Sequence, residues 1–113
     1  MAKTLTEIDE IQKYLEGVLN RAGHHAQNVQ EVILTLVGAL IWKKGDTPIK
    51  AMYSEDDYKN VMWAYINNKK YAFSYNHADK TIDMRQGSTQ GITIKTFTND
   101  TTPSEIMQFF RDL

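Results

Sequence analysis

The residues in this sequence best suited to chemistry are three histidines and a run of carboxylates. His24 and His25 are adjacent, His77 lies far along the chain, and Glu55-Asp56-Asp57 is an acidic run. Neighbouring residues on a helix do not face each other, so the adjacent histidines cannot share one metal ion there. No histidine or carboxylate pair has a ligand spacing such as HExxH. We expect junction and turn histidines and a solvated acidic connection, with no metal site and no catalytic residue.

The stretch from Gly87 to Gly91 resembles a phosphate-binding loop in its glycines alone. It lacks a following Lys-Ser/Thr pair, and it lies between two predicted strands with no helix N-terminus to face a phosphate. The chain contains no cysteine, and no Ser, Thr or Lys stands in a nucleophile motif such as G-x-S-x-G. The sequence therefore predicts a hairpin loop and no cofactor, and it favours a binding protein over an enzyme.

Aromatic and basic residues interleave along the predicted strands, and they are the main functional clue. They are Trp63, Tyr65 and Phe97 together with Lys70, Arg85 and Lys95. Such a sheet face could stack the bases of single-stranded nucleic acid. However, it carries no RNP-like signature, Asp83 lies among the cations, and the net charge of −1 supplies no positive field. We expect an interaction surface for protein or a small ligand rather than for nucleic acid; the alternative is that these aromatics only support cross-strand pairs.

Two helices are predicted at the ends of the chain. Residues 5–22 repeat apolar side chains at spacings of three and four after the capping-box sequence Thr4-Leu5-Thr6-Glu7. Thr102-Pro103-Ser104-Glu105 begins the closing helix, with Pro at a position that needs no N–H group. Both helices present one apolar stripe.

The second helix in chain order, over residues 28–44, is apolar on nearly every side. A polar start at Asn28 precedes it, and Lys43-Lys44-Gly45 supplies cations and a glycine at its end. Because a helix that is apolar all round must be covered all round, we expect it at the centre of the helical layer with Leu36 buried. Trp42 is its candidate contact residue.

Five strands are predicted between the second and the last helix: 49–53, 61–66, 69–76, 81–86 and 92–98. Pro48 suits an edge strand, residues 54–60 form a polar connection, and Asn67-Asn68 favours a type I′ hairpin turn. The register pairs Met62 with Phe73, Phe73 with Met84, and Met84 with Ile94. The core face then carries Met62, Ala64, Tyr71, Phe73, Ile82, Met84, Ile92 and Ile94. The other face carries Val61, Trp63, Tyr65, Lys70, Ser74, Thr81, Asp83, Arg85, Thr93, Lys95 and Phe97.

The element order ααβββββα predicts an α+β domain with an antiparallel meander of four or five strands. The 113 residues are enough for one domain, 1–113, with a proper core. The absence of cysteine suits a reducing cytoplasm. The polar start of the chain predicts neither a signal nor a transit peptide, and no apolar run is long enough to span a membrane.

The segment from Tyr58 to His77, YKNVMWAYINNKKYAFSYNH, continuing to Gly91, resembles the small orphan α+β proteins encoded by integron mobile gene cassettes. The resemblance runs through most of the chain and lies in its general sequence texture. It implies a bacterial, cytoplasmic protein that is often oligomeric, and it assigns no site residues.

The sequence as a whole favours a non-enzymatic binding or interaction protein that forms a homodimer through the aromatic sheet face or the second helix. Two alternatives stay open. One is a small-molecule binder or small enzyme with a pocket between sheet and helices. The other is an immunity or antitoxin protein whose acidic segment, Glu55 to Asp57, masks a basic toxin surface.

Overall fold

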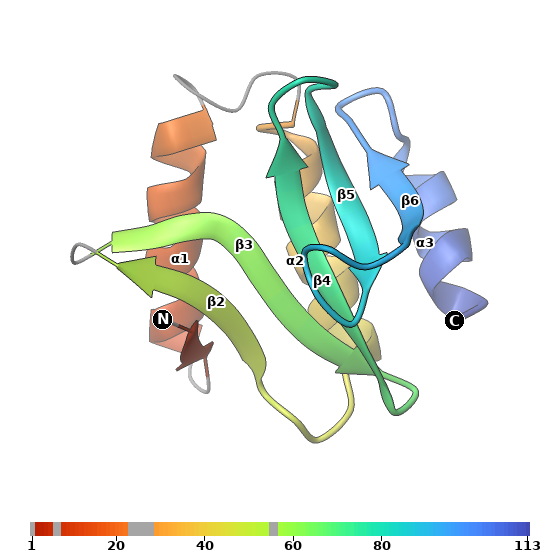
Figure 1. Ribbon diagram of the computed structural model, residues 1–113, viewed down its shortest axis with the longest axis horizontal. Coiled ribbons are helices and arrows are strands. Elements are labelled where there is room, and N and C mark those ends of the chain that lie inside the picture. Colours follow the sequence, from red (N-terminus) through yellow and green to blue (C-terminus); the bar gives the residue numbers. More distant parts are fainter. Residues whose placement is uncertain (1, 6–7, 23–28, 55–56) are drawn as a thin grey trace.

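The computed structural model describes residues 2–5, 8–22, 29–54 and 57–113. Its elements follow the order β1 (Ala2–Leu5), α1 (Ile8–Ala22), α2 (Val32–Lys43), β2 (Ile49–Ser54), β3 (Asp57–Ile66), β4 (Lys69–Asn76), β5 (Thr81–Gln86), β6 (Thr93–Phe97) and α3 (Pro103–Arg111). All strand pairs are antiparallel, and the strands lie in the sheet in chain order (Figure 1). The predicted α+β class is confirmed.

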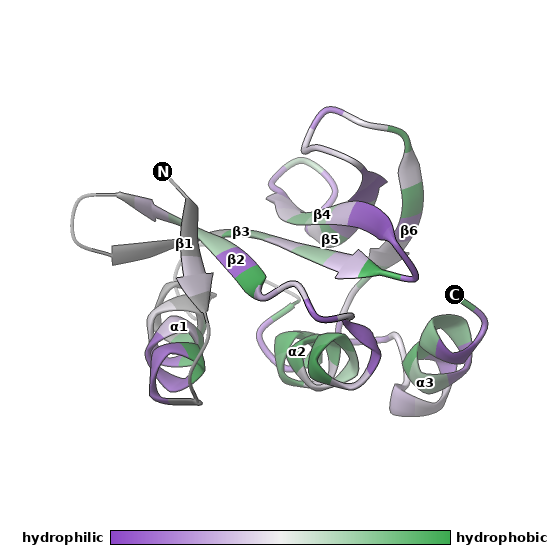
Figure 2. Ribbon diagram, turned by 90° about the horizontal axis from the view of Figure 1, so that it is seen from below, coloured by the Kyte–Doolittle hydropathy of each residue, from purple (hydrophilic) through white to green (hydrophobic). Residues whose placement is uncertain are grey.

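The three helices pack on one face of the sheet, with α2 between α1 and α3 (Figure 2). Leu36 and Leu40 of α2 are completely buried against the sheet. The expected central position of this helix is therefore confirmed. None of the described helices is both long and apolar enough to cross a lipid bilayer.

The central hairpin forms as its turn residues predict. Asn67 and Asn68 have φ angles of 52° and 64°, the left-handed conformation that a type I′ turn requires. Met62 pairs with Phe73, and Phe73 pairs with Met84. The register of β3, β4 and β5 is thus confirmed.

The start of the chain differs from the prediction. Leu5, expected to begin a helix, ends strand β1, which pairs with β2; Thr6 and Glu7 of the predicted capping box lie outside the described residues. The backbone groups on the outer side of β2 need hydrogen-bond partners, and β1 supplies them. The strand that follows Pro48 is therefore not the sheet edge, and the predicted edge position is wrong.

The connection predicted over residues 54–60 is also shorter than expected. Strand β2 continues to Ser54 and β3 begins at Asp57, so residues 57–60 belong to a strand. Ser54 pairs with Asp57 and Tyr53 pairs with Tyr58, which explains why a polar segment is extended: cross-strand hydrogen bonds satisfy its backbone.

The largest correction concerns β6. Met84 pairs with Lys95 instead of Ile94, and the ladder is irregular between Met84 and Arg85. A shift of one residue exchanges the two faces of a strand, so Phe97 is buried while Ile92 and Ile94 are exposed by 77% and 40%. The predictions that Phe97 lies beside Trp63 and Tyr65, and that both isoleucines are core residues, are wrong.

Aromatic packing gives the physical reason for this register. The Phe97 ring centroid lies 6.0 Å from that of Phe109 and 6.3 Å from that of Phe110, both in α3. Burying the larger aromatic side chain against two rings removes more apolar area from water than burying an isoleucine would.

The ends of α2 depend on distant residues. The backbone N–H groups of Glu31 and Val32 both donate to Oδ1 of Asn99, each at 3.0 Å, so the cap comes from the connection between β6 and α3. The predicted cap, Asn28, lies outside the described residues. At the other end, Lys44 is extended and the N–H of Gly45 donates to the carbonyl of Tyr65 at 3.0 Å. The predicted capping box of α3, Thr102 with Glu105, is confirmed.

Candidate interaction surfaces

Four of the predicted surface residues do meet on the sheet face turned away from the helices, which we name the open sheet face. Trp63 lies between two buried core residues in β3, so its side chain points to the opposite side. Tyr65 pairs with Lys70, and Ala72 stands between Trp63 and Arg85 across three strands. Phe97 and Lys95 are on the other side of the sheet, where Lys95 Nζ lies 5.5 Å from the ring centroid of Phe109 in α3, so their predicted place on this surface is wrong.

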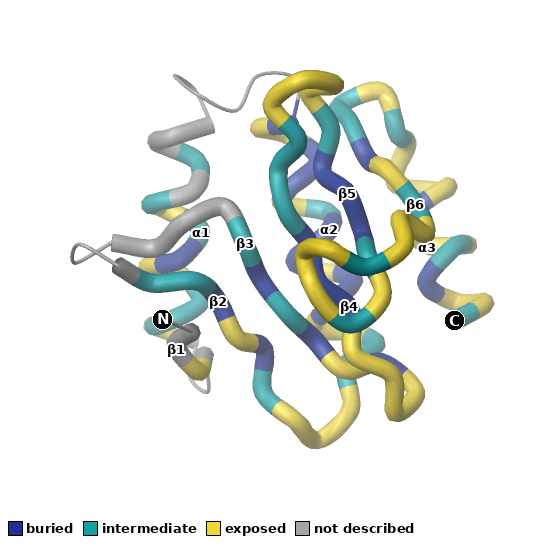
Figure 3. The backbone as a smooth tube through the Cα atoms, viewed as in Figure 1, coloured by how far each residue is buried: buried dark blue, intermediate teal, exposed yellow. Residues whose placement is uncertain are grey.

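The loop between β5 and β6 covers part of the open sheet face, where it passes over β4 (Figures 1 and 3). The N–H of Gly87 donates to the carbonyl of Lys70 at 2.8 Å. A Cβ atom at Gly91 would lie 1.9 Å from the carbonyl oxygen of Gln86, so this position requires glycine. Gly87 has a φ angle of 80°, a left-handed conformation that favours glycine. The two glycines of this loop therefore serve different needs, a close approach to β5 at Gly91 and a positive φ at Gly87.

A buried carboxylate organises the polar part of the open sheet face. Asp83 is only 3% exposed and accepts hydrogen bonds from Thr81 Oγ1 at 2.6 Å, Asn76 Nδ2 at 3.1 Å and Arg85 Nη2 at 3.2 Å. Arg85 Nη1 also donates to the carbonyl of Gly91 at 3.1 Å. Arg85, a predicted binding residue, thus neutralises Asp83 and holds the loop.

The helical layer exposes a more apolar surface. Leu34, Ile41 and Trp42 of α2 and Met107 of α3 are each between 46% and 53% exposed, and we name them the helical patch. Gly38 is also exposed. It lies on the same side of α2 as the patch, because Gly38, Ile41 and Trp42 follow Leu34 by four, seven and eight residues, and residues at these spacings share one side of a helix. The expectation that α2 is covered all round therefore fails within one chain.

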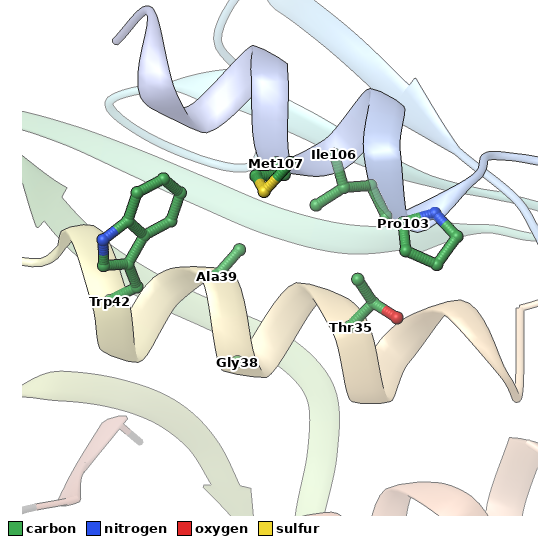
Figure 4. Close-up of a pocket in the computed structure, with 7 residues that line it drawn as sticks. All are labelled: Thr35, Gly38, Ala39, Trp42, Pro103, Ile106 and Met107. Atoms are coloured by element: carbon green, nitrogen blue, oxygen red, sulfur yellow. The ribbon is translucent and has the colours of Figure 1, made fainter.

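A groove of about 180 Å³ runs along this surface between α2 and α3. Its lining residues are Thr35, Gly38, Ala39, Trp42, Pro103, Ile106 and Met107 (Figure 4). The Thr35 hydroxyl and the Trp42 indole N–H are the polar side-chain groups among them. Thr35 and Pro103 line one end of the groove, and Trp42 stands at the other (Figure 4). The two helices run in the same direction along it.

Each of the two helices places one cationic side chain beside the Trp42 indole ring. Lys43 Nζ lies 5.3 Å from the ring centroid, and Arg111 Cζ lies 6.0 Å from it, within the range of cation–π attraction. The groove therefore has an aromatic wall and a basic end. The sequence marks Trp42 as a candidate contact but does not link it to α3. The sequence pattern that points to this surface is the spacing of Leu34, Ile41 and Trp42, which places three large apolar residues on one side of the helix.

The residues first considered for chemistry form no site in the part of the chain that the structure describes. His77 packs edge-on against Tyr75, with ring centroids 4.8 Å apart. No group of three or more His, Asp or Glu side chains there could hold a metal ion. His24, His25, Glu55 and Asp56 lie outside the described residues.

Comparison with known proteins gives one family match. Residues 11–108 match the family model described as "Integron cassette protein VCH_CASS1 chain", which spans the chain from α1 to α3. No curated protein matches the chain. The expected resemblance to integron cassette proteins is confirmed, and the family description states neither a reaction nor a ligand.

Proposed function

We propose that this chain, which belongs to the integron cassette protein family, is a protein-interaction module that forms a homodimer through the helical patch. The observation that carries the proposal is the set of four large apolar side chains, each about half exposed, on neighbouring positions of α2 and α3. The largest exposed apolar patch of a soluble protein, about 300–600 Å² in area, is often its functional surface.

The size of the helical patch supports a stable contact. Its four side chains expose on the order of 400 Å² together, about half of what each partner buries in a standard interface. Thr35 is partly exposed and Pro103 is exposed beside the groove, so both can add to the contact. Trp42 is suited to the centre of such a contact because large aromatic side chains dominate interface energies.

The open sheet face is the weaker candidate for this contact. Tyr65 is its most exposed aromatic residue, at 38%, and Arg85 is already paired with Asp83. Covering these groups would bury less apolar surface and would add the desolvation of Lys50 and Lys70, which are exposed there. At the helical patch the neighbouring charges are those of Lys43 and Arg111 beside the Trp42 ring. Their long side chains can keep the charged groups at the rim of a contact while the apolar side chains are covered.

The groove does not favour the small-molecule alternative. Its volume of about 180 Å³ is below the ~300–1,000 Å³ of most ligand pockets, and it lies outside the helical layer instead of between sheet and helices. We also propose that the protein acts in the bacterial cytoplasm, because a chain without cysteine suits reducing conditions.

Light scattering over a micromolar dilution series tests the proposal. We expect a mass of twice the 13.0 kDa chain that falls towards the monomer on dilution. Trp42→Ser should shift this transition to at least about tenfold higher concentration, because a central interface tryptophan is lost. The matched control is Ile92→Ser, since Ile92 is more exposed than Trp42 but lies in the β5–β6 loop on the opposite side of the sheet. A constant monomer mass for the wild-type chain would refute the proposal.

Fluorescence locates the contact independently. The chain has two tryptophans, so Trp63→Phe leaves Trp42 as the single reporter. Its emission should shift to shorter wavelength as the protein is concentrated, because association removes water from the indole. In Trp42→Phe, measured up to concentrations at which light scattering shows this variant to be dimeric, the remaining Trp63 should show no such shift. A concentration-dependent shift from Trp63 alone would place the contact on the open sheet face.

A further inference from the structure

We infer that the two copies of the proposed dimer pack α2 against α2 in antiparallel orientation, around a two-fold axis that passes beside Gly38. Each Trp42 then enters the Thr35–Pro103 end of the other copy's groove. This inference rests on the proposed homodimer and specifies its geometry, which no family property supplies.

Residue spacing on α2 supports the position of the axis. Gly38 lies midway between Leu34 and Trp42, four residues from each, and all three are exposed. In an antiparallel pair centred on Gly38, Leu34 of one copy faces Trp42 of the other, and the reverse contact forms by symmetry. A two-fold interface requires such a self-complementary surface.

Gly38 itself is otherwise unexplained. No neighbouring atom lies within 4 Å of the place where its Cβ would sit, and its backbone is not in the left-handed region. Glycine in a helix interior weakens the helix relative to alanine. Close approach of a second backbone would give this residue a role, because a side chain there would separate the two helices.

Charge selects the antiparallel arrangement over the parallel one. Lys43 and Lys44 lie at the end of α2, while Glu31 precedes its first turn. Helix α3 has Glu105 in its first turn, whereas Arg111 in its last turn is followed by Asp112 as the C-cap, so the charge difference between the two ends lies in α2. A parallel two-fold pair would bring the basic ends of both copies together. An antiparallel pair brings basic ends to acidic ends, which favours association.

The side on which α3 lies determines where Trp42 goes. A two-fold axis that lies in the interface and runs perpendicular to α2 leaves the α3 helices of both copies on the same side. Trp42 leans towards α3 in its own chain (Figure 4). It therefore meets the α3 side of the other copy at the opposite end of the groove, lined by Thr35 and Pro103. The groove is filled by the second copy.

Disulfide trapping tests the axis directly, because the natural chain has no cysteine. Gly38→Cys should form a covalent dimer rapidly under mild oxidation, since two residues on the axis can come within disulfide distance. Leu34→Cys, one turn away and equally accessible, should not, because Leu34 faces Trp42 in this arrangement. Crosslinking of Leu34→Cys as fast as Gly38→Cys would indicate a parallel or unspecific contact and overturn the inference.

A second variant is needed because the introduced cysteine could itself disturb the contact between the two helices. Gly38→Leu should fold normally, because the monomer has open space there, and should weaken dimerisation by about tenfold or more. An unchanged dimer dissociation constant for this variant would overturn the inference while leaving the homodimer intact. A wild-type chain that stays monomeric would instead refute the proposed function on which the inference rests.

Discussion

The open sheet face and the helical patch each carry one of the two tryptophans, but their surroundings differ. Trp63 lies in a sheet whose neighbouring polar groups are paired with one another and partly covered by the β5–β6 loop. Trp42 lies beside exposed Ile41 and Met107, and the cations near it leave its outer side uncovered. Aromatic content alone does not distinguish a docking surface. The difference lies in whether the polar groups around the tryptophan ring already have hydrogen-bond partners and whether another part of the chain already covers them.

Charged side chains also have different roles on the two surfaces. On the open sheet face, Arg85 is tied to a buried carboxylate and a loop carbonyl, so its charge stabilises the fold. On the helical side, the charges stand at the ends of an apolar surface, where they can orient a partner without being buried.

Phe97→Ala should have the largest effect, a loss of about 3 to 5 kcal/mol in the free energy of unfolding. Phe97 is fully buried and packs on Phe109 and Phe110. The control is Tyr65→Ala on the open sheet face, which should cost far less. Chemical denaturation measures the free energy of unfolding of both variants. Equal losses would contradict the burial of Phe97 beneath α3 and indicate that it lies on the open sheet face.

Leu36→Ala should cost about 2 to 5 kcal/mol, because the side chain has no exposed surface and its removal leaves a cavity. Leu34→Ala, on the same helix but in the helical patch, should change monomer stability by no more than about 0.5 kcal/mol. Denaturation at a concentration where the chain is monomeric provides the comparison. A loss below about 0.5 kcal/mol for Leu36→Ala would contradict the central position of α2.

Asp83→Ala should destabilise the fold by about 1 to 3 kcal/mol, because it leaves the Thr81, Asn76 and Arg85 donors without their acceptor. Amide hydrogen exchange in the β5–β6 loop should increase, since Arg85 loses the group that orients it. The dimer dissociation constant should stay unchanged, because the network lies on the open sheet face. A weaker dimer would show that this face takes part in the contact.

Asn99→Ala should lower stability by about 1 kcal/mol, the usual effect of losing a helix cap. Its side chain accepts from two backbone N–H groups at the start of α2. Asn99→Asp keeps the acceptor and should retain most of the stability, which separates the cap from other effects of the substitution. Thermal or urea unfolding distinguishes the two variants.

Gly38→Ala should have the smallest effect and opposite signs on two properties. Monomer stability should increase by about 0.5 to 1 kcal/mol, because alanine favours the helix and meets no neighbouring atom. Dimerisation should become weaker, since the added methyl group separates the two helices. Urea unfolding of the monomer and light scattering measure the two properties, and a stronger dimer would contradict the close approach at Gly38.

Local patterns in the sequence determine several parts of this fold. Asn67-Asn68 specifies the hairpin turn, and the alternation on either side of it sets the pairing of Met62 with Phe73. Thr102 and Glu105 specify the start of α3. The apolar run of α2 predicts its central place and the burial of Leu36. In each case the residues that decide the structure lie within a few positions of each other.

Contacts between distant residues decide the rest. Strand β1 forms only because β2 offers an unpaired edge, and Asn99 caps a helix that begins 67 residues earlier. The irregularity between Met84 and Arg85 moves Phe97 to the core because α3 presents two aromatic rings there. Likewise, Trp42 joins a groove only when α3 lies beside α2. A sequence pattern encodes the periodicity of each element, but the faces that become buried depend on packing partners brought together only in three dimensions.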